Sequence, residues 1–550
     1  MNKWVNFVEK IHIYIQTLKY IKISQIYWRL RRKIIKKPHL KSIQVFSRII
    51  YAETWIKPIL KRSSLISINP WKFNFLNQEG DLEKGWNNQN KSKLWLYNLH
   101  YHDILLSDID LEIKKSFISI WIKENSPQEG NGWEPYPLSL RIVNWVKFYL
   151  SYQVAPEGFW ESLRLQTQSL MNQLEFHLLG NHLFENAKAL IFSVSLLGGV
   201  ATKKWQKKGF SILQSQLDEQ ILEDGGHFER SPMYHSIILE GILDLINLSS
   251  ISDFPIEIKD HLIKISHKMF IWLESMIHPD GQISFFNDST LGISSTFEEL
   301  LSYAERLKLS QPRNKLLFSF MKNSQFIMAR KEKVYLVADV GSVSPNYLPG
   351  HAHAETLSFE LSLHGKRLFI NSGISTYENN SLRHEQRSTN AHNTLCLNSE
   401  NSSHVWDSFR VAERARISNL CVEQNEKNYH FKARHDGYYK KYGVYHEREF
   451  FLQDNNLVIR DALCGDKKGL YDVEIFLHVH PSWHIIQEDT QTLSFHQNEK
   501  IVYLMLDKKS SCDLLPSHWN FEFNQYMLNQ KIKIKIKPDV NVSWDMSLKW

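Results

Sequence analysis

Lys531-Ile532-Lys533-Ile534-Lys535-Ile536-Lys537 is the clearest β-strand pattern in the chain, because charged and aliphatic residues alternate along it with a period of two. A strand with this pattern turns one row of side chains to the core and the other to water. A similar alternation starts at Val334–Asp339, and the Asp-Asn-Asn sequence inside Glu449–Ile459 is typical of a hairpin turn. The C-terminal part is therefore predicted to be an antiparallel β-sandwich.

From about residue 100 to 325, before the predicted β-sandwich, the hydrophobic residues recur with helical spacing instead. Leu140, Val143, Val146 and Leu150 follow the spacing of one helix face, and short breakers rich in Gly, Pro and Asn separate such runs. This pattern favours stacked helical hairpins. We therefore expect three parts: a basic N-terminal extension packed on the helical domain (1–90), the helical domain (91–325) and an antiparallel β-sandwich (326–550).

Composition and charge narrow the class of protein. The 550 residues are 43% hydrophobic and 23% charged, which is typical of a globular chain with more than one domain. Aromatic residues reach 13%; they fill a large core or line a sugar-binding cleft. The four cysteines have no CxxC spacing, so neither a disulfide framework nor a cysteine zinc site is indicated.

The net charge of +7 is modest, but basic residues cluster near the N-terminus, with a run over 29–37. No nucleic-acid motif accompanies this run, so we expect a solvated face, or contact with anionic polysaccharide or peripheral contact with anionic lipid, rather than nucleic acid. Met1–Tyr20 lacks the apolar stretch and cleavage site of a signal peptide, and no apolar stretch is long enough to span a bilayer. A cytoplasmic or peripheral inner-membrane location is expected, with the periplasm as the alternative.

Gly180-Asn181-His182-Leu183-Phe184-Glu185-Asn186 places polar groups inside a helical region. His182 and Glu185 are three residues apart and share a helix face, so the carboxylate is expected to orient the imidazole. A plain structural hydrogen bond on a helix is the alternative interpretation of this pair.

A second polar cluster lies in Asp224–His235 around a Gly-Gly turn. Ser231-Pro232 is typical of a helix start, which places Tyr234 in the first turn. A nearby cation such as Arg230 is expected to lower the pKa of the Tyr234 phenol. The alternative is a capped helix with a buried tyrosine.

The segment Gly350-His351-Ala352-His353-Ala354-Glu355 precedes a strand pattern. Alternate residues of a strand share a face, so His351, His353 and Glu355 are expected to continue one row beyond the edge of the core. This spacing is compatible with a catalytic pair, a metal-binding pair or two structural histidines.

Two further polar and aromatic clusters supply candidate substrate-binding residues, one over 132–144 and one over 383–393. No Gly-rich phosphate loop, GxSxG elbow or HExxH motif is present. The segment around Tyr234 adds Arg230 and His235. The candidate substrate-binding residues are therefore Trp133, Glu134, Tyr136, Arg141, Arg230, His235 and Arg387.

Five segments in this order resemble the heparinase II/III superfamily of polysaccharide lyases. They are NGWEPYPLSLRIVNW (131–145), GNHLFENAKAL (180–190), GGHFERSPMYH (225–235), GHAHAETLSFEL (350–361) and RSTNAHNT (387–394). The resemblance implies an incomplete (α/α) toroid followed by an antiparallel β-sandwich. It also implies an enzyme that cleaves a uronic-acid-containing glycan by β-elimination.

The resemblance further implies a role for each catalytic candidate. Asn181 and His182 would neutralise the uronate carboxylate, with Glu185 orienting His182. Tyr234 would act as base, acid or both, and His351 would be the partner base from the β-domain.

A structural zinc is found in some similar proteins, and the resemblance assigns His353 and His392 as ligands. Asn371 is the third candidate ligand, although it stands where the family usually has Asp, a better zinc ligand. A two-residue turn at His364-Gly365 would place Asn371 opposite Ser358, on the face away from His353, and a β-bulge would reverse this.

Two other functions remain open from the sequence. A glycoside hydrolase on the same fold would need two carboxylates, for which Glu134, Glu185 and Glu229 are candidates. A non-catalytic glycan-binding protein of surface-polysaccharide assembly is the other alternative. The N-terminal stretch around Gln25–Arg32 resembles members associated with bacterial surface polysaccharides rather than secreted lyases.

Overall fold

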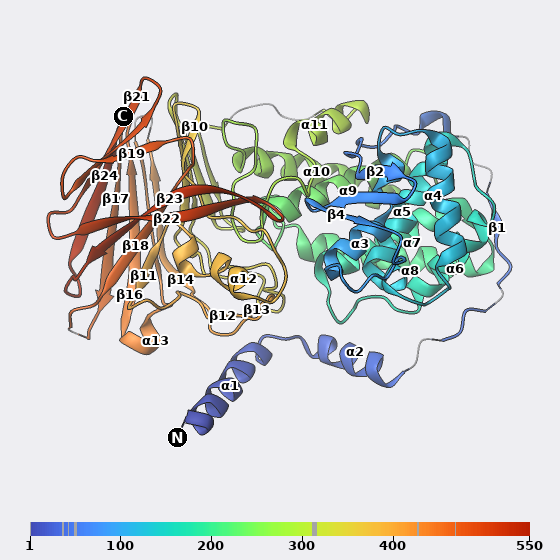
Figure 1. Ribbon diagram of the computed structural model, residues 1–550, viewed down its shortest axis with the longest axis horizontal. Coiled ribbons are helices and arrows are strands. Elements are labelled where there is room, and N and C mark those ends of the chain that lie inside the picture. The colour runs from blue at the N-terminus through green and yellow to red at the C-terminus, as the bar shows by residue number, and fades with distance from the viewer. Residues whose placement is uncertain are drawn as a thin grey trace.

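The computed structural model describes residues 2–35, 38–41, 43–48, 52–310, 316–425, 428–467 and 469–550, and it consists of a helical domain followed by a β-domain (Figure 1). This order confirms the one predicted from the hydrophobic periods. Within the described ranges, no helix is both long and apolar enough to cross a membrane.

The helical domain is built around α7 (Gly180–Leu196), which is buried along nearly its whole length. It packs against α5, α6, α8 and α9, so its first turn is held from several sides. The helices of this domain are α3 (Lys93–Tyr101), α4 (Leu111–Glu124), α5 (Pro135–Tyr152), α6 (Phe159–Met171), α7, α8 (Val200–Gln220), α9 (Pro232–Leu248), α10 (Ile256–Ser275) and α11 (Phe297–Arg306). A small sheet of β2 (Leu65–Ile68), β3 (Trp71–Phe75) and β4 (Gln78–Asp81) lies beside them.

Two antiparallel sheets form the β-domain. The strands of the first, in spatial order, are β22 (Ser511–Glu522), β23 (Gln525–Ile536), β18 (Val473–Val479), β10 (Lys366–Phe369), β9 (Phe359–Leu363), β8 (Val334–Asp339), β7 (Phe326–Arg330) and β6 (Phe318–Met321), with β11 (Leu395–Leu397) also paired to β18. Those of the second are β14 (Ile417–Gln424), β15 (Tyr429–His435), β16 (Val444–Leu452), β17 (Asn456–Gly465), β24 (Ser543–Lys549), β21 (Lys500–Leu506), β20 (Thr492–Gln497) and β19 (His484–Gln487).

The core of the sandwich lies between these sheets. Phe359 of the first sheet meets Phe450 of the second edge to face, with the ring centroids 5.6 Å apart. In β23 the isoleucines of the 531–537 repeat are buried and the lysines between them are not. The predicted hairpin is also present, since Leu452 of β16 pairs with Leu457 of β17. The alternation with a period of two is therefore confirmed.

The chain does not form a strand at the His-x-His segment. Regular β structure starts only at Phe359, and Leu357 has a positive φ of 66° that turns the backbone. The prediction of one row from His351 to Glu355 is therefore wrong. A β-bulge also lies between Arg367 and Phe369, so the register of β9 and β10 differs from that of a simple hairpin.

Residues 2–35, here called the strap, run below both domains in Figure 1 as α1 (Asn2–Leu18) and α2 (Ile23–Ile34). From α1, Thr17 accepts a hydrogen bond from the Trp406 indole of the β-domain, at 3.1 Å. From α2, Trp28 stacks on Phe176 of the helical domain, with the centroids 4.9 Å apart. The strap thus contacts both domains, and its α2 packs on the helical domain.

A second element bridges the domains. The β22–β23 hairpin extends toward the helical domain in Figure 1, and its tip bonds to the β3–β4 turn. Asn77 donates to the Glu522 carboxylate at 2.9 Å, and Asn524 donates to the Leu76 carbonyl at 2.8 Å. The seam between the domains is therefore spanned at more than one place.

Candidate active site

The helical side of the site is the first turn of α7. Gly180 has a positive φ of 58°, and a Cβ atom there would lie 2.5 Å from a Leu348 methyl and 3.1 Å from the Glu229 carboxylate. Only glycine fits this backbone between two neighbours. As a result, Asn181 and His182 are presented directly at the seam with the β-domain.

His182 is oriented by Glu175, not by Glu185. Its Nδ1 lies 3.1 Å from the Glu175 Oε1, and its ring packs 4.4 Å from that of Tyr136. Glu185 instead bonds to Lys188, three residues further along α7, at 2.9 Å. The predicted Glu185–His182 pair is therefore wrong, because the Glu185 carboxylate is paired with the buried ammonium group of Lys188.

Burial alone would lower the pKa of His182, but the Glu175 carboxylate raises it above its ordinary value. A raised pKa stabilises the folded protein below the unfolded value of ~6.5, and this contribution is lost as pH rises through the folded pKa. We expect Glu175→Gln to move the alkaline limb of substrate affinity to lower pH, because the imidazolium loses its counter-charge. NMR titration of the His182 ring should show the same lowering of its pKa in Glu175→Gln. The exposed Glu157→Gln is the control and should titrate like the wild type. Identical titration curves for wild type and Glu175→Gln would contradict it.

Tyr234 lies in the first turn of α9, where its backbone N–H bonds to the Ser231 hydroxyl at 3.2 Å, as predicted from the Ser-Pro sequence. Its own hydroxyl is 3.2 Å from that of Tyr377, and its ring is 4.0 Å from His351. Burial raises the pKa of Tyr234 well above 10. The expected lowering by Arg230 is wrong, because Arg230 is buried and paired with Asp339.

Asp288, which lies between α10 and α11 of the helical domain, binds the side chains that the β-domain contributes to the site. It accepts from His351 Nδ1 at 2.8 Å, from His353 Nε2 at 2.8 Å, and from both terminal nitrogens of Arg383 at 2.5 and 2.7 Å. Burial alone would raise the pKa of Asp288, but the Arg383 guanidinium holds it well below its usual range. An ionised Asp288 fixes the His351 tautomer, which leaves Nε2 as an acceptor facing the seam.

Glu229 joins the two sides. Its carboxylate is buried beside Gly180 and lies 3.7 Å from His351 Nε2. Neither oxygen has a hydrogen-bond partner among the described residues, and burial raises the pKa of Glu229. The two other carboxylates considered for hydrolysis are held elsewhere, Glu134 by Lys93 at 2.9 Å and Glu185 by Lys188. The paired carboxylates of a hydrolase are thus not assembled from these candidates.

A buried cluster of His353, His392 and Glu355 lies next to Asp288. His353 Nδ1 is 3.1 Å from His392 Nε2, which is 3.3 Å from the Glu355 Oε2. The outer ring nitrogens face acceptors, Asp288 at 2.8 Å and the Ser388 carbonyl at 2.8 Å. The inner nitrogens are therefore both unprotonated in the neutral rings, an arrangement that suits a cation between them.

These spacings fit zinc, because ligand atoms ~2.0–2.1 Å from a tetrahedral zinc lie about 3.3 Å from one another. The Asn371 side-chain oxygen, which the sequence offered as a ligand, accepts from the Asn393 backbone at 3.2 Å. The carboxylate that the structure adds to the two histidines is Glu355.

Five predicted substrate-binding residues are buried within the protein: Trp133, Arg141, Arg230, His235 and Arg387. Arg387 illustrates the reason, since it donates to the carbonyls of Ala352 and Asp407 and fixes the loop around His351. These residues support the site from behind, and their prediction as substrate ligands is wrong. Tyr136 does lie at the site, against His182.

Three site residues, Glu175, Asp288 and Tyr377, were not predicted from the sequence. Asp288 follows the apolar pair Phe285-Phe286 in a segment without helical or strand periodicity, which is a weak signal for a polar site residue. Tyr377 lies in a loop after β10, and Glu175 lies between two helices. Their partners are distant in sequence, so no local pattern links them.

Comparison with known proteins identifies two family models that together match most of the chain. "Heparinase II/III N-terminus" matches residues 111–316 and "Heparinase II/III-like, C-terminal" matches residues 313–545. A heparin-sulfate lyase of Bacteroides stercoris is 24% identical over 368 residues, which cover 61% of this chain and 52% of that protein. The chain thus spans about half the length of this curated relative.

Solved structures share the fold. A crystal structure of heparinase III covers 95% of this chain and 88% of its own, with a TM-score of 0.68 and 17% identity. A chondroitin AC lyase of Streptomyces coelicolor covers 83% of this chain and 75% of its own, with a TM-score of 0.50 and 7% identity. These likenesses confirm the predicted toroid followed by a β-sandwich.

Proposed function

The chain belongs to the heparinase II/III superfamily, and from that membership we propose that it is a polysaccharide lyase that cleaves a uronic-acid-containing glycan by β-elimination. One observation carries the proposal. The Glu229 carboxylate lies beside Gly180 and 3.7 Å from His351 Nε2, so the amide–imidazole edge of the toroid is next to the Tyr234–His351 pair.

The first requirement of the reaction is to make the uronate C5 proton acidic. A carboxylate next to C5 opposes its removal, so the negative charge that develops must be offset. The Asn181 amide and the His182 imidazole supply a hydrogen-bond donor and a positive charge at one edge. Glu175 favours the charged form of His182, which suits this role.

The second requirement is a base and an acid. His351 Nε2 is the base in this proposal, because Asp288 holds the proton on the other ring nitrogen. Tyr234 is the acid that protonates the departing 4-oxygen, because its raised pKa keeps the phenol protonated. The π electrons of the new C4–C5 double bond come from the broken C5–H bond, and the C4–O bond breaks.

The substrate class is an anionic polysaccharide. The relatives carry the names heparin-sulfate lyase and chondroitin AC lyase, and acidic bacterial surface polysaccharides extend the same chemistry. The test incubates the purified protein with a panel of uronate-containing glycans and follows ultraviolet absorbance, because elimination leaves an unsaturated uronate. A glycan that is cut without a rise in absorbance would contradict elimination and favour a hydrolase.

Structural zinc is part of the proposal, with His353, His392 and Glu355 as its ligands. Bound zinc would contribute positive charge that holds this loop together beside Asp288. At a zinc concentration of 100 times Kd we expect stabilisation of about 2.7 kcal/mol, measured by thermal unfolding with and without chelator. His392→Ala should lose both the stabilisation and the bound zinc, whereas the exposed His484→Ala should keep them. Equal zinc content in both variants would contradict the assignment.

A further inference from the structure

The strap presents an apolar face that nothing in the described structure covers. On α2 the exposed residues follow the spacing of one helix face, and α1 repeats the pattern. They are Ile23, Ile26, Tyr27, Leu30 and Ile34 on α2, and Ile11, Ile15 and Leu18 on α1. Their exposed fractions range from 41% to 86%, which is unusual for two consecutive apolar stripes.

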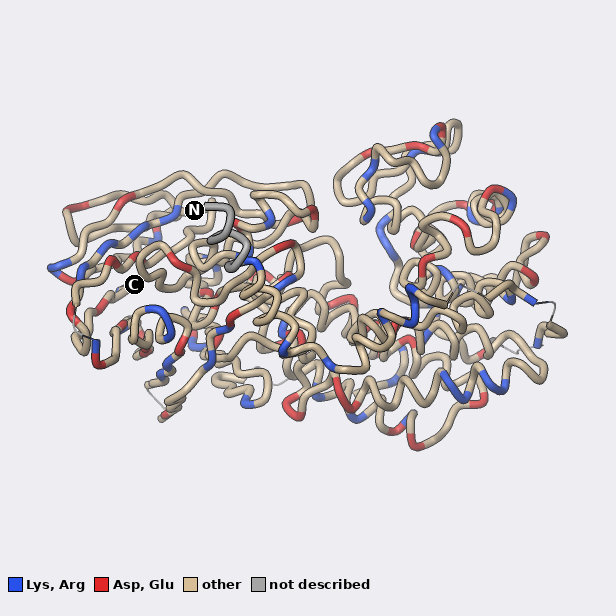
Figure 2. Tube along the Cα trace, turned by 90° about the horizontal axis from the view of Figure 1, so that it is seen from below, with Lys and Arg blue, Asp and Glu red and all other residues tan. Residues whose placement is uncertain are grey.

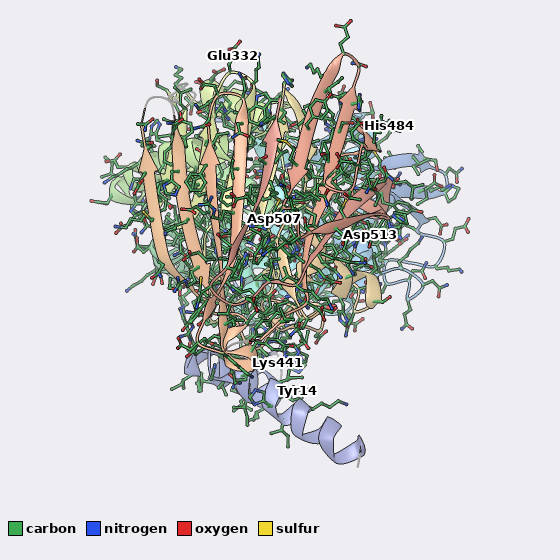
Figure 3. The ribbon with its side chains drawn as sticks, turned by 90° about the vertical axis from the view of Figure 1, so that its left-hand side faces the viewer. Tyr14, Glu332, Lys441, His484, Asp507 and Asp513 are labelled. Carbon is green, nitrogen blue, oxygen red and sulfur yellow. The ribbon has the colours of Figure 1, made fainter. Side chains whose placement is uncertain are left out.

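The opposite face of each helix is already occupied. Gln25, Trp28 and Arg32 of α2 contact the segment Phe176–Leu178. On α1, His12 bonds to Glu413 at 3.0 Å, and the Tyr14 ring meets the Trp406 ring edge to face with the centroids 5.4 Å apart. The strap is thus fixed by its polar and aromatic side, and the aliphatic stripes face away from both domains. Figure 3 shows α1 projecting beyond the sandwich with Tyr14 on it.

The charge of the strap is almost entirely positive. Residues 2–35 contain eight Lys and Arg and a single acidic residue, Glu9, which gives a formal charge of +7. The whole chain also carries +7, so the remainder is neutral overall. Figure 2 views the molecule from the side of the strap and shows Lys and Arg along it.

We propose that the strap is a membrane-docking surface, and that its two apolar stripes insert into the interface of a bilayer containing anionic lipid. Aliphatic residues on one face and Lys and Arg beside them are the features of helices that lie in a bilayer surface. Phosphate headgroups match the positive charge, which a second copy of this chain would not, since two such segments repel. A glycan is also a poor fit, because Ile and Leu offer it no hydrogen bonds. The proposal is independent of the lyase activity.

The test is flotation of the full chain with vesicles, either phosphatidylcholine alone or equal amounts of phosphatidylcholine and phosphatidylglycerol. We expect binding to the anionic vesicles at low ionic strength, weaker binding to neutral ones, and a loss on adding salt. Ile23→Ser/Leu30→Ser/Ile34→Ser should lower the partition coefficient at least tenfold, because most of the α2 stripe is removed. Lys10→Glu/Lys19→Glu/Lys33→Glu should lower the partition coefficient on anionic vesicles by at least about fivefold for each Lys replaced.

A matched control removes three exposed apolar residues elsewhere, Ile256→Ser/Leu470→Ser/Leu528→Ser, and should bind like the wild type. Circular dichroism and cleavage of the glycan substrate check that every variant is folded. Failure of the wild type to float with anionic vesicles would overturn the proposal. So would equal flotation of the stripe variant, or a wild-type dimer that the stripe variant dissociates.

Discussion

Replacing Tyr234 by phenylalanine is expected to lower kcat by about 10²–10⁴-fold, the range attributed to a positioned general acid or base. KM should change little, because the ring that packs 4.0 Å from His351 is retained. The lost contact is the 3.2 Å hydrogen bond to Tyr377, so the free energy of unfolding should fall by only ~1 kcal/mol. Initial rates from ultraviolet absorbance and urea unfolding measure the two effects.

Tyr335→Phe is the matched control for this prediction. Its hydroxyl is also buried and makes a single hydrogen bond, to the Ser275 carbonyl at 2.9 Å. It should lose similar stability and keep its full kcat. A Tyr234→Phe protein with unchanged kcat would rule out the proposed role of the phenol as acid.

Replacing Asp288 by asparagine is expected to destabilise the protein by about 3–5 kcal/mol, because Arg383 is left as an uncompensated buried charge. The folded fraction should also lose activity, since an amide does not hold His351 in the tautomer that leaves Nε2 free. Urea unfolding gives the first effect, and kcat corrected for the folded fraction gives the second.

The sandwich contains a matched control. Asp461 is buried and bonds to Arg448 at 2.7 and 2.9 Å and to His446 at 2.7 Å, so it has the same kind of partners but bonds to none of the proposed catalytic residues. Asp461→Asn should lose comparable stability while the folded protein keeps its kcat. If both variants keep full activity per folded molecule, Asp288 has no positioning role.

The periodic parts of the fold were predictable because their signal is local. Alternation in β23 and helical spacing in α5 depend only on near neighbours in sequence. The His351–Glu355 segment was not predictable in the same way. Its conformation depends on Leu357 with a positive φ and on Asp288, which is more than 60 residues away.

The carboxylate partners in the site were also not predictable from local spacing. His182 and Glu185 have the right spacing for a pair, but Lys188 lies three residues after Glu185, just as His182 lies three before it. Lys188 is buried together with Glu185. A buried ammonium without a counter-ion costs more than an imidazole without one, since imidazole can be neutral. Glu185 therefore pairs with Lys188, and the His182 ring bonds to Glu175 in the preceding loop.

The bridges across the seam determine how the two domains can move. The strap joins Phe176 to Trp406 on one side, and the hairpin tip joins Glu522 to Asn77 on another. Hinge opening would break both sets of contacts together, so a clam-like motion is costly in this chain. Because these contacts tie the domains together, heat or urea should unfold toroid and sandwich in one transition rather than in two.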